Sequence, residues 1–213
     1  MMTRASAIIP AYNEAERISA VIAPLQAAER VDEIIVVDDD STDGTAQIAF
    51  RHNARVIKMP RNLGKAAALD RGVREAQNDI LLFLDADLVG LQASHIDLLI
   101  SLYEEKNLDM LVGVFKNGRL NTDIAQTIAP YLSGQRVLRR RHWNKLRESG
   151  KLEFGVEMAL TKLSIKENWV EERVFLEGVT HVMKEKKRGF SQGFIERIHM
   201  YGDILRSLFT RVS

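Results

Sequence analysis

The segment 80–87, Ile-Leu-Leu-Phe-Leu-Asp-Ala-Asp, decides the fold of this 213-residue chain. Its first five residues are all apolar, as in a strand that is buried on both faces. Two aspartates follow where such a strand would end. Because a strand buried on both faces needs a covering layer on each side, the segment predicts a central strand of an α/β sheet.

Strand and helix patterns alternate on either side of this segment. Short apolar runs predict further strands at residues 6–10, 34–37, 55–59 and 110–115. Helical spacing of apolar residues predicts helices at residues 18–25, 65–77 and 96–103, with a short one at 45–51. Asn13 is the expected N-cap of the first helix. The alternation predicts a mostly parallel sheet covered by helices on both faces, with ligands bound beyond the C-terminal ends of its strands.

Composition excludes several classes of protein. The chain is 46% hydrophobic and has no cysteine, which excludes a disulfide scaffold, a thiolate zinc site and a cysteine nucleophile. The chain has no Gly-x-Gly-x-x-Gly or Walker-type loop, so it lacks the phosphate-binding loop of dinucleotide oxidoreductases and of P-loop enzymes. No stretch approaches the roughly 20 apolar residues of a membrane-spanning helix, and the N-terminus lacks a secretory pattern. We therefore expect a cytoplasmic protein, and peripheral attachment to the inner face of the cell membrane stays open.

The formal net charge of +1 conceals an uneven distribution along the chain. Residues 1–134 carry 13 Lys and Arg against 19 Asp and Glu, whereas residues 135–213 carry 17 against 10. An acidic first part and a basic second part suggest partners of different kinds. Chance placement of solvated surface charge is the alternative.

Carboxylates gather where three of the predicted strands end. Glu14 follows the first strand and the Asp run 38–40 follows the second, while Asp85 and Asp87 follow the central one. Because Asp85 and Asp87 alternate along an extended segment, both side chains can face one metal ion. Oxygen ligands of this kind suit Mg²⁺ or Mn²⁺ on a diphosphate. The alternative is that these acidic residues, which follow the strands, only cap the helices that come next.

Four motifs in a fixed order carry a family resemblance. They are Pro-Ala-Tyr-Asn-Glu-Ala (10–15), Ile-Val-Val-Asp-Asp-x-Ser-Thr-Asp-Gly-Thr (35–45), Asn-Leu-Gly-Lys-x-x-Ala-Leu (62–69) and Phe-Leu-Asp-Ala-Asp (83–87). Together they resemble the family 2 glycosyltransferases of the GT-A fold, which is Rossmann-like. The resemblance covers roughly residues 5–115. It implies transfer of a sugar from a nucleotide diphosphate donor, with Mn²⁺ or Mg²⁺ on the donor diphosphate.

The resemblance also implies roles for single residues. The donor-binding candidates are Pro10, Ala11, Tyr12 and Glu14 at the nucleoside, Asp39 at the base or ribose, Lys65 near base or phosphate, and Asp85 and Ala86 with Asp87 at the ribose and metal. Asp85 and Asp87 are the implied metal ligands. The family usually has glycine where this chain has Asp40, so the turn there is expected to bend differently.

The basic second part is where we expect the acceptor. Residues 123–146 read as a helix broken near Gly134, and Gln135 and Arg136 are the acceptor-binding candidates beside an arginine cluster at 139–141. Guanidinium groups grip phosphate in a two-pronged way, which suits an anionic acceptor. A solvated basic face is the alternative. Nucleic acid is not an expected partner, because few aromatic residues are interleaved with the basic ones.

Residues 154–184 are similar to two branches of the resembled class, the polyprenyl-phosphate sugar transferases and the glucosyl-3-phosphoglycerate synthases. By position, the second branch implies that His181 joins the metal. Both branches use phosphorylated acceptors, which are already ionised at neutral pH and need little help from a base. A sugar hydroxyl acceptor would need one, and Glu157 is the candidate. Its alternative is a helix-surface glutamate or the partner of an arginine.

We expect three segments: a nucleotide-sugar-binding half (1–115), an acceptor-binding half of the same domain (116–192) and an amphipathic basic helix (193–213). That helix suits contact with an anionic membrane or packing on its own domain or a second subunit. The predicted function is metal-dependent transfer of a hexose from UDP-glucose or GDP-mannose to polyprenyl phosphate or a small phosphorylated acid. Asp87 and Glu157 are the predicted catalytic residues. A non-catalytic adaptor of the same fold, binding a nucleotide sugar or a membrane surface, is the alternative.

Overall fold

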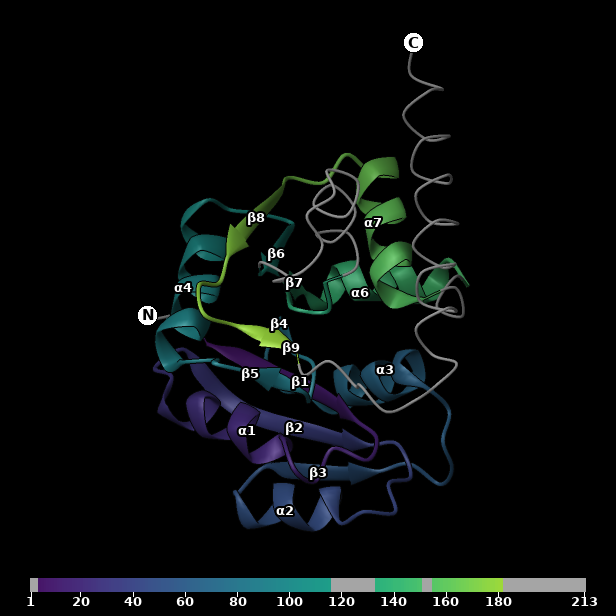
Figure 1. The fold of residues 1–213 in the computed structure, drawn as a ribbon. Helices are drawn as coiled ribbons and strands as arrows, with labels where there is room; N and C mark the ends of the chain where they lie inside the picture. The colour runs from purple at the N-terminus through teal and green to yellow at the C-terminus, as the bar shows by residue number, and fades with distance from the viewer. Residues whose placement is uncertain (1–3, 116–132, 151–154, 182–213) are drawn as a thin grey trace, which may run out of the picture.

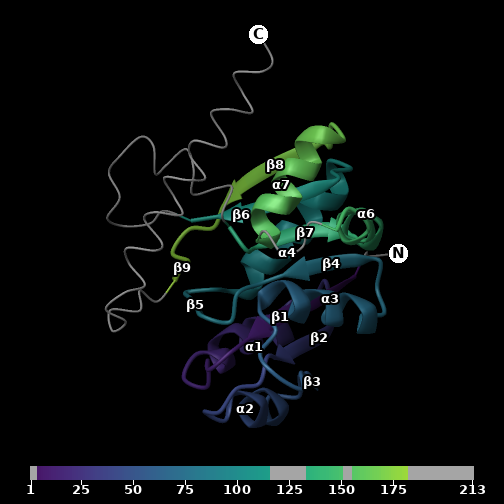
Figure 2. The ribbon, with the colours of Figure 1, turned by 90° about the vertical axis from the view of Figure 1, so that its right-hand side faces the viewer.

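The computed structural model describes residues 4–115, 133–150 and 155–181. Within these residues, seven strands form one sheet in the order β3-β2-β1-β4-β7-β6-β8 (Figure 1). Its strands are β1 (Ala5–Ala11), β2 (Val31–Asp38), β3 (Arg55–Lys58), β4 (Ile80–Phe83), β6 (Met110–Val114), β7 (Arg136–Arg139) and β8 (Glu171–Phe175). Two short strands, β5 (Leu88–Val89) and β9 (Thr180–His181), pair beside it (Figure 2).

The sheet is mostly parallel, as the sequence predicts. Strand β1 is parallel to β2 and β4, β2 to β3, and β6 to β8. Strand β7 alone among the seven described strands of the sheet runs antiparallel to its neighbours, β4 and β6. The C-terminal ends of β1, β2, β4 and β6 therefore share one edge with the beginning of β7. We call this edge the strand-end edge.

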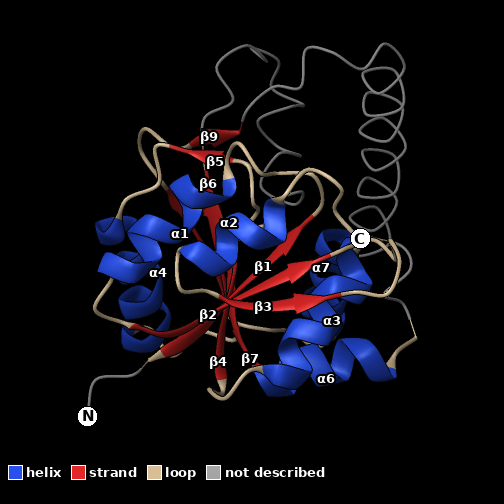
Figure 3. Ribbon diagram, turned by 90° about the horizontal axis from the view of Figure 1, so that it is seen from below, coloured by secondary structure: helices blue, strands red, loops and turns tan. Residues whose placement is uncertain are grey.

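Helices cover both faces of the sheet (Figure 3). The helices α1 (Ile18–Ala27), α2 (Thr45–Arg51) and α4 (Ala93–Glu105) pack on one face, and α3 (Lys65–Glu75), α6 (Arg140–Glu148) and α7 (Val156–Lys166) on the other. Neighbouring residues of one strand enter different cores, as Ile8 and Ile9 of β1 do. This explains why the strands are apolar on both faces. None of the described helices is long and apolar enough to cross a membrane.

Two details of the predicted helices are wrong. Residues 136–139, predicted as part of a helix, form strand β7, because Val137 and Leu138 alternate between the two cores. Helix α6 begins only at Arg140. Asn13 does not cap the first helix, since α1 begins at Ile18 and Asn13 lies in the loop before it with φ of 55°.

The arginine cluster 139–141 lies at the edge opposite the strand-end edge, because Arg139 pairs with Ile80 at the beginning of β4. Arg140 donates hydrogen bonds to the carbonyls of Ala76 (2.7 Å) and Asn78 (2.8 Å) just after α3. Arg139 and Arg141 form ion pairs with aspartates of neighbouring loops. The cluster thus joins α3, β7 and α6 to one another at this edge, and its contact with an anionic acceptor stays a prediction.

His142 is a buried residue of α6, 4% exposed, and is expected to make the fold sensitive to acid. Its Nε2 lies 3.1 Å from Asp109 Oδ1, and its Nδ1 has no hydrogen-bond partner among the described residues. Burial lowers the pKa of His142, and Asp109 offsets this only in part. In the unfolded chain the imidazole would take up a proton near its ordinary pKa of 6.5, while the folded chain resists it.

The free energy of unfolding should therefore be fully maintained above pH 6.5 and fall as the pH drops below that value. One proton sets an upper limit of about 1.4 kcal/mol per pH unit on this slope. Urea unfolding between pH 5 and 8 measures it, and His142→Phe should flatten the profile. If His142→Phe keeps the pH slope of the unmodified protein, groups other than His142 cause the acid sensitivity.

Candidate active site at the strand-end edge

Hydrogen bonds fasten the loop after β1 to the loop after β2. The Asn13 N–H donates to Ser41 Oγ (3.0 Å), and the Thr42 N–H donates back to Asn13 Oδ1 (2.9 Å). The Glu14 N–H donates to Thr45 Oγ1 at 2.9 Å. Polar residues in both motifs therefore hold the two loops in a fixed relation. Tyr12, in the loop directly after β1, is 46% exposed.

Asp43 strengthens the same junction. Its carboxylate accepts the N–H groups of Ala15 and Thr45, both at 3.1 Å. Although burial acts to raise the pKa of Asp43, these bonds and one from the Thr45 hydroxyl hold it below its ordinary value. The predicted nucleoside contacts flank this junction: Pro10 and Ala11 end β1, and Glu14 is 6% exposed with a 3.0 Å contact to Arg17.

The Asp run 38–40 separates into three environments. Asp39 is buried and accepts the N–H groups of Leu63 (2.8 Å) and Gly64 (2.7 Å), so it fixes the loop that leads into α3. Asp38 is also buried, and its Oδ1 has no hydrogen-bond partner among the described residues. Asp40 has a φ of 67°, the left-handed conformation that glycine adopts easily. A glycine at this position would adopt the same conformation easily, and a different bend of the turn relative to the family stays a prediction.

Lys65, the first residue of α3, joins two carboxylates from distant parts of the chain. Its Nζ lies 2.5 Å from Asp85 Oδ1 and 2.5 Å from Glu157 Oε1. Burial would lower the pKa of Lys65, but the two carboxylates outweigh it and raise the pKa above its ordinary value. The ammonium therefore stays charged and ties Asp85, after β4, to the first turn of α7.

The second carboxylate oxygen of Asp85 faces the beginning of β7. Gln135 Nε2 donates to Asp85 Oδ2 at 2.8 Å, and Gln135 is fully buried. The Arg136 side chain is 1% exposed and donates to the Ser133 carbonyl (3.0 Å) and to Thr161 Oγ1 (3.4 Å). Burial lowers the pKa of Arg136, with Glu157 among the groups that oppose this. Both acceptor candidates thus lie inside the protein here, and their acceptor role stays a prediction.

Asp85, Asp87 and His181 are the implied ligands of Mn²⁺ or Mg²⁺. Asp87 is half-buried at the turn after β4, and the next residue, Leu88, pairs with His181 across β5 and β9. The strand pairing thus brings the backbone of His181 beside Asp87. The described residues include no group of three or more His, Asp or Glu arranged to hold a metal ion by themselves. Carboxylate donors such as Asp85 and Asp87 fit a divalent ion whose remaining ligands come from a diphosphate.

The sequence pattern did not point to two residues of this region, Ser133 and Gly134. Ser133 Oγ lies 2.8 Å from Gln135 Oε1, and Gly134 lies against Asp85 and Lys65. The only signal in the sequence is their position directly before Gln135, since Gly134 reads as a helix break when residues 123–146 are taken as helical. The antiparallel course of β7 brings them to the strand-end edge.

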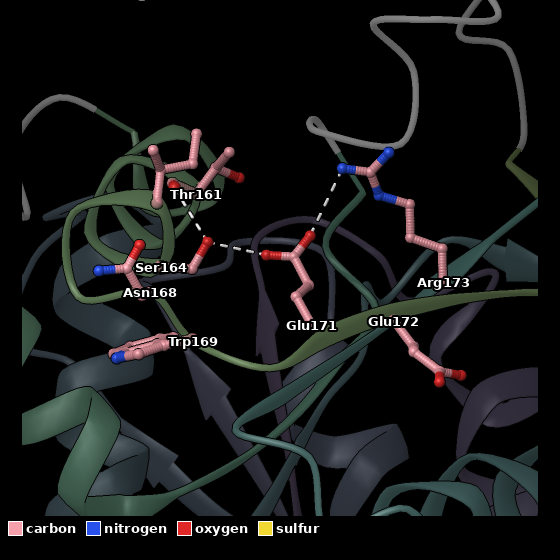
Figure 4. A pocket seen from close by; sticks show the side chains of 8 residues that line it. Thr161, Ser164, Asn168, Trp169, Glu171, Glu172 and Arg173 are labelled. Carbon is pink, nitrogen blue, oxygen red and sulfur yellow. Dashed lines mark hydrogen bonds and ion pairs between the residues drawn. The ribbon is translucent and has the colours of Figure 1, made fainter. Parts of the chain in front are cut away.

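A groove of about 510 Å³ lies between α7 and β8 (Figure 4). Its polar groups contact one another: Ser164 Oγ lies within hydrogen-bonding distance of Glu171 Oε2 (2.8 Å) and of the Thr161 carbonyl (3.0 Å). Arg173 lies 3.5 Å from Glu171. None of the predicted donor, acceptor or metal residues lines this groove.

Residues 6–162 match the family described as glycosyl transferase family 2, and the chain belongs to that family. Among its curated relatives, dolichol-phosphate mannosyltransferase of Pyrococcus furiosus is 30% identical over 166 residues, covering 75% of this chain and 42% of the relative. Dodecaprenyl-phosphate galacturonate synthase of Rhizobium johnstonii is 30% identical over 143 residues, covering 61% and 42%. Dolichyl-phosphate beta-glucosyltransferase of Trichomonas vaginalis is 39% identical over 94 residues, covering 38% and 28%.

The matches therefore span less than half the length of these relatives. Among solved structures, glucosyl-3-phosphoglycerate synthase of Mycobacterium tuberculosis, in complex with Mn²⁺, UDP and phosphoglyceric acid, has a TM-score of 0.73 with this chain. It is 24% identical, and the match covers 89% of this chain and 73% of that one. This likeness shows a shared fold and confirms the predicted GT-A architecture.

Proposed function

We propose that the protein transfers a hexose from a nucleotide diphosphate sugar, UDP-glucose or GDP-mannose, to a phosphate-bearing acceptor. The acceptor would be a polyprenyl phosphate or a small phosphorylated acid. Membership of the family supports the reaction type, and relatives named for polyprenyl-phosphate acceptors support the acceptor class. The observation that carries the proposal is the convergence of Lys65, Asp85 and Glu157 at the strand-end edge beside Asp87.

The chain's own residues supply donor binding. The fastened loops after β1 and β2 present Tyr12 and the end of β1 to the nucleoside, while Asp39 holds the loop before Lys65 in place. Lys65 contributes a fixed positive charge for the diphosphate. Asp87 and His181 would hold Mn²⁺ or Mg²⁺, and Asp85 would join them if it exchanged a contact with Lys65 or Gln135. The bound ion would stabilise charge on the leaving diphosphate.

The environment of Glu157 favours an acceptor that is already ionised. Its Oε1 lies 2.5 Å from the Lys65 ammonium, so this carboxylate is already engaged in an ion triplet with Lys65 and Asp85. A phosphate acceptor needs no proton removed at neutral pH. In the proposed reaction Glu157 therefore keeps Lys65 in position, and its predicted role as a base applies to hydroxyl acceptors.

A thermal-shift panel tests donor binding. Purified protein would be heated with UDP-glucose, GDP-mannose and dTDP-glucose, each with and without Mn²⁺. We expect one nucleotide class to raise the melting temperature, and to do so more strongly with the metal, because a ligand that binds only the folded state stabilises it. If no nucleotide sugar raises the melting temperature and none is hydrolysed, the proposed enzymatic function is wrong.

The amphipathic helix predicted at residues 193–213 lies outside the described residues, and its contact with a membrane or a second subunit stays a prediction. Vesicle flotation with and without residues 194–213 tests it. Co-flotation of the full chain with anionic vesicles, lost in the shortened chain, is the expected result for membrane contact. If both chains float with the vesicles to the same extent, the segment does not bind the membrane, and packing on its own domain or a second subunit is its expected role.

A further inference from the structure

The segment before β7 fits around the Asp85 carboxylate more closely than a side chain at position 134 would allow. A Cβ atom added to Gly134 would lie 2.5 and 2.6 Å from the two carboxylate oxygens of Asp85 and 2.7 Å from Lys65 Nζ. Contacts this short do not occur, so any side chain here would displace Asp85, Lys65 or both. The φ of Gly134 lies outside the left-handed region, so the backbone itself does not require glycine. Space beside Asp85 is the local reason for glycine at this position.

The residues on either side of Gly134 hold the same carboxylate from the interior. Gln135 Nε2 donates to Asp85 Oδ2 at 2.8 Å, and Gln135 Oε1 lies 2.8 Å from Ser133 Oγ. The main chain of Gln135 is fixed in turn, because its carbonyl accepts the Gly113 N–H of β6 at 2.9 Å. Both side chains are buried, so the arrangement is shielded from competing water.

We propose that Ser133, Gly134 and Gln135 form a cradle that positions Asp85 for the donor diphosphate and its metal. Gly134 provides the space in which Asp85 and Lys65 meet, and Gln135 sets the orientation of the carboxylate. These are positioning residues that act through Asp85. This inference rests on the proposed function and deepens it, since it gives Gln135 a role at the donor side in place of the predicted contact with the acceptor.

Gly134→Ala tests the cradle, with Gly72→Ala as a matched control. The Cβ added at Gly72 would lie equally close, 2.5 Å, to a neighbour, but that neighbour is the core side chain of Ile8. Titration calorimetry with UDP and Mn²⁺ should show affinity at least 10-fold weaker for Gly134→Ala. Gly72→Ala should lower the melting temperature and keep the affinity of the unmodified protein. In turnover assays, Gly134→Ala should raise the donor KM and leave the acceptor KM unchanged.

A double-mutant cycle tests the contact without any ligand. Gly134→Ala should lower the melting temperature of the unmodified protein, and it should do so less in an Asp85→Ala background, where Lys65 is the only one of the two displaced groups that remains. Equal losses in both backgrounds would overturn the cradle, as would unchanged UDP affinity in Gly134→Ala. If Gly134→Ala fails to fold, Gln135→Leu keeps the bulk and removes the amide, and it must still weaken UDP binding. If the unmodified protein binds neither UDP nor GDP, the proposed function fails, while the cycle still reports on the cradle.

Discussion

Asp87→Ala is expected to lower nucleotide-sugar turnover by roughly 100- to 1,000-fold, the usual loss when a group that stabilises leaving-group charge is removed. Asp87 is half-buried at the turn after β4, and its chain neighbour Leu88 is paired with His181. Alanine would remove the carboxylate without changing the buried strand before it. The added Mn²⁺ required for half-maximal rate should rise as well.

Asp79→Ala is the matched control for this prediction. Asp79 lies at the opposite edge of the sheet, where it pairs with Arg139, and its side chain is 57% exposed. Release of nucleoside diphosphate, followed across a Mn²⁺ titration, measures both variants. A non-catalytic adaptor would have no turnover to lose, and its partner binding would survive the Asp87 substitution. Turnover of Asp87→Ala equal to that of Asp79→Ala would remove Asp87 from the site.

Lys65→Met is expected to weaken nucleotide binding and also to lower the free energy of unfolding. The substitution keeps the aliphatic stem but removes the ammonium that lies 2.5 Å from both Asp85 and Glu157. Two carboxylates would then face each other without a cation and would repel the donor diphosphate. We expect affinity for UDP with Mn²⁺ to fall at least tenfold. Because the Lys65 side chain is 38% exposed and partly screened by solvent, the free energy of unfolding should fall by only about 1 to 2 kcal/mol.

Lys166→Met provides the comparison, since Lys166 also lies on a helix but its side chain is 74% exposed and 3.9 Å from Glu167. Urea unfolding and titration calorimetry on both variants separate the loss of one positive charge from the loss of the ion triplet. We expect the control to match the unmodified protein in both measurements. If Lys65→Met also matched the control in both, the ion triplet would have no role in nucleotide binding or stability.

The sequence predicts the sheet and the first half of the site because their signals are local. The apolar run 80–84 followed by Asp85 and Asp87 is enough to place a central strand and its acidic end, and the structure has β4 there. The parallel arrangement of β1, β2 and β4 then brings the loops of three motifs to one edge. For these elements, each motif lies within a few residues of the strand that positions it.

The basic second part was less predictable because its structure depends on distant partners. Strand β7 is four residues long and follows residues that read as helical, so only pairing with β4 and β6 establishes it as a strand. Its antiparallel direction brings Gln135 to Asp85 but sends Arg139 to the opposite edge. Nothing in the local pattern separates two residues only four positions apart. The contact between Lys65 and Glu157, which are 92 residues apart, is equally invisible in the sequence.

Detection of the glycosylated acceptor tests the proposed hexose transfer most directly. The protein would be incubated with Mn²⁺, a nucleotide hexose, and either a polyprenyl phosphate or a phosphoglycerate, and both products would be followed by mass spectrometry. We expect an acceptor heavier by one hexose, formed in equal amount with nucleoside diphosphate and lost on chelation of the metal. Donor and acceptor that both remain unchanged with every combination, in protein shown to bind the nucleotide, would contradict the proposed transfer.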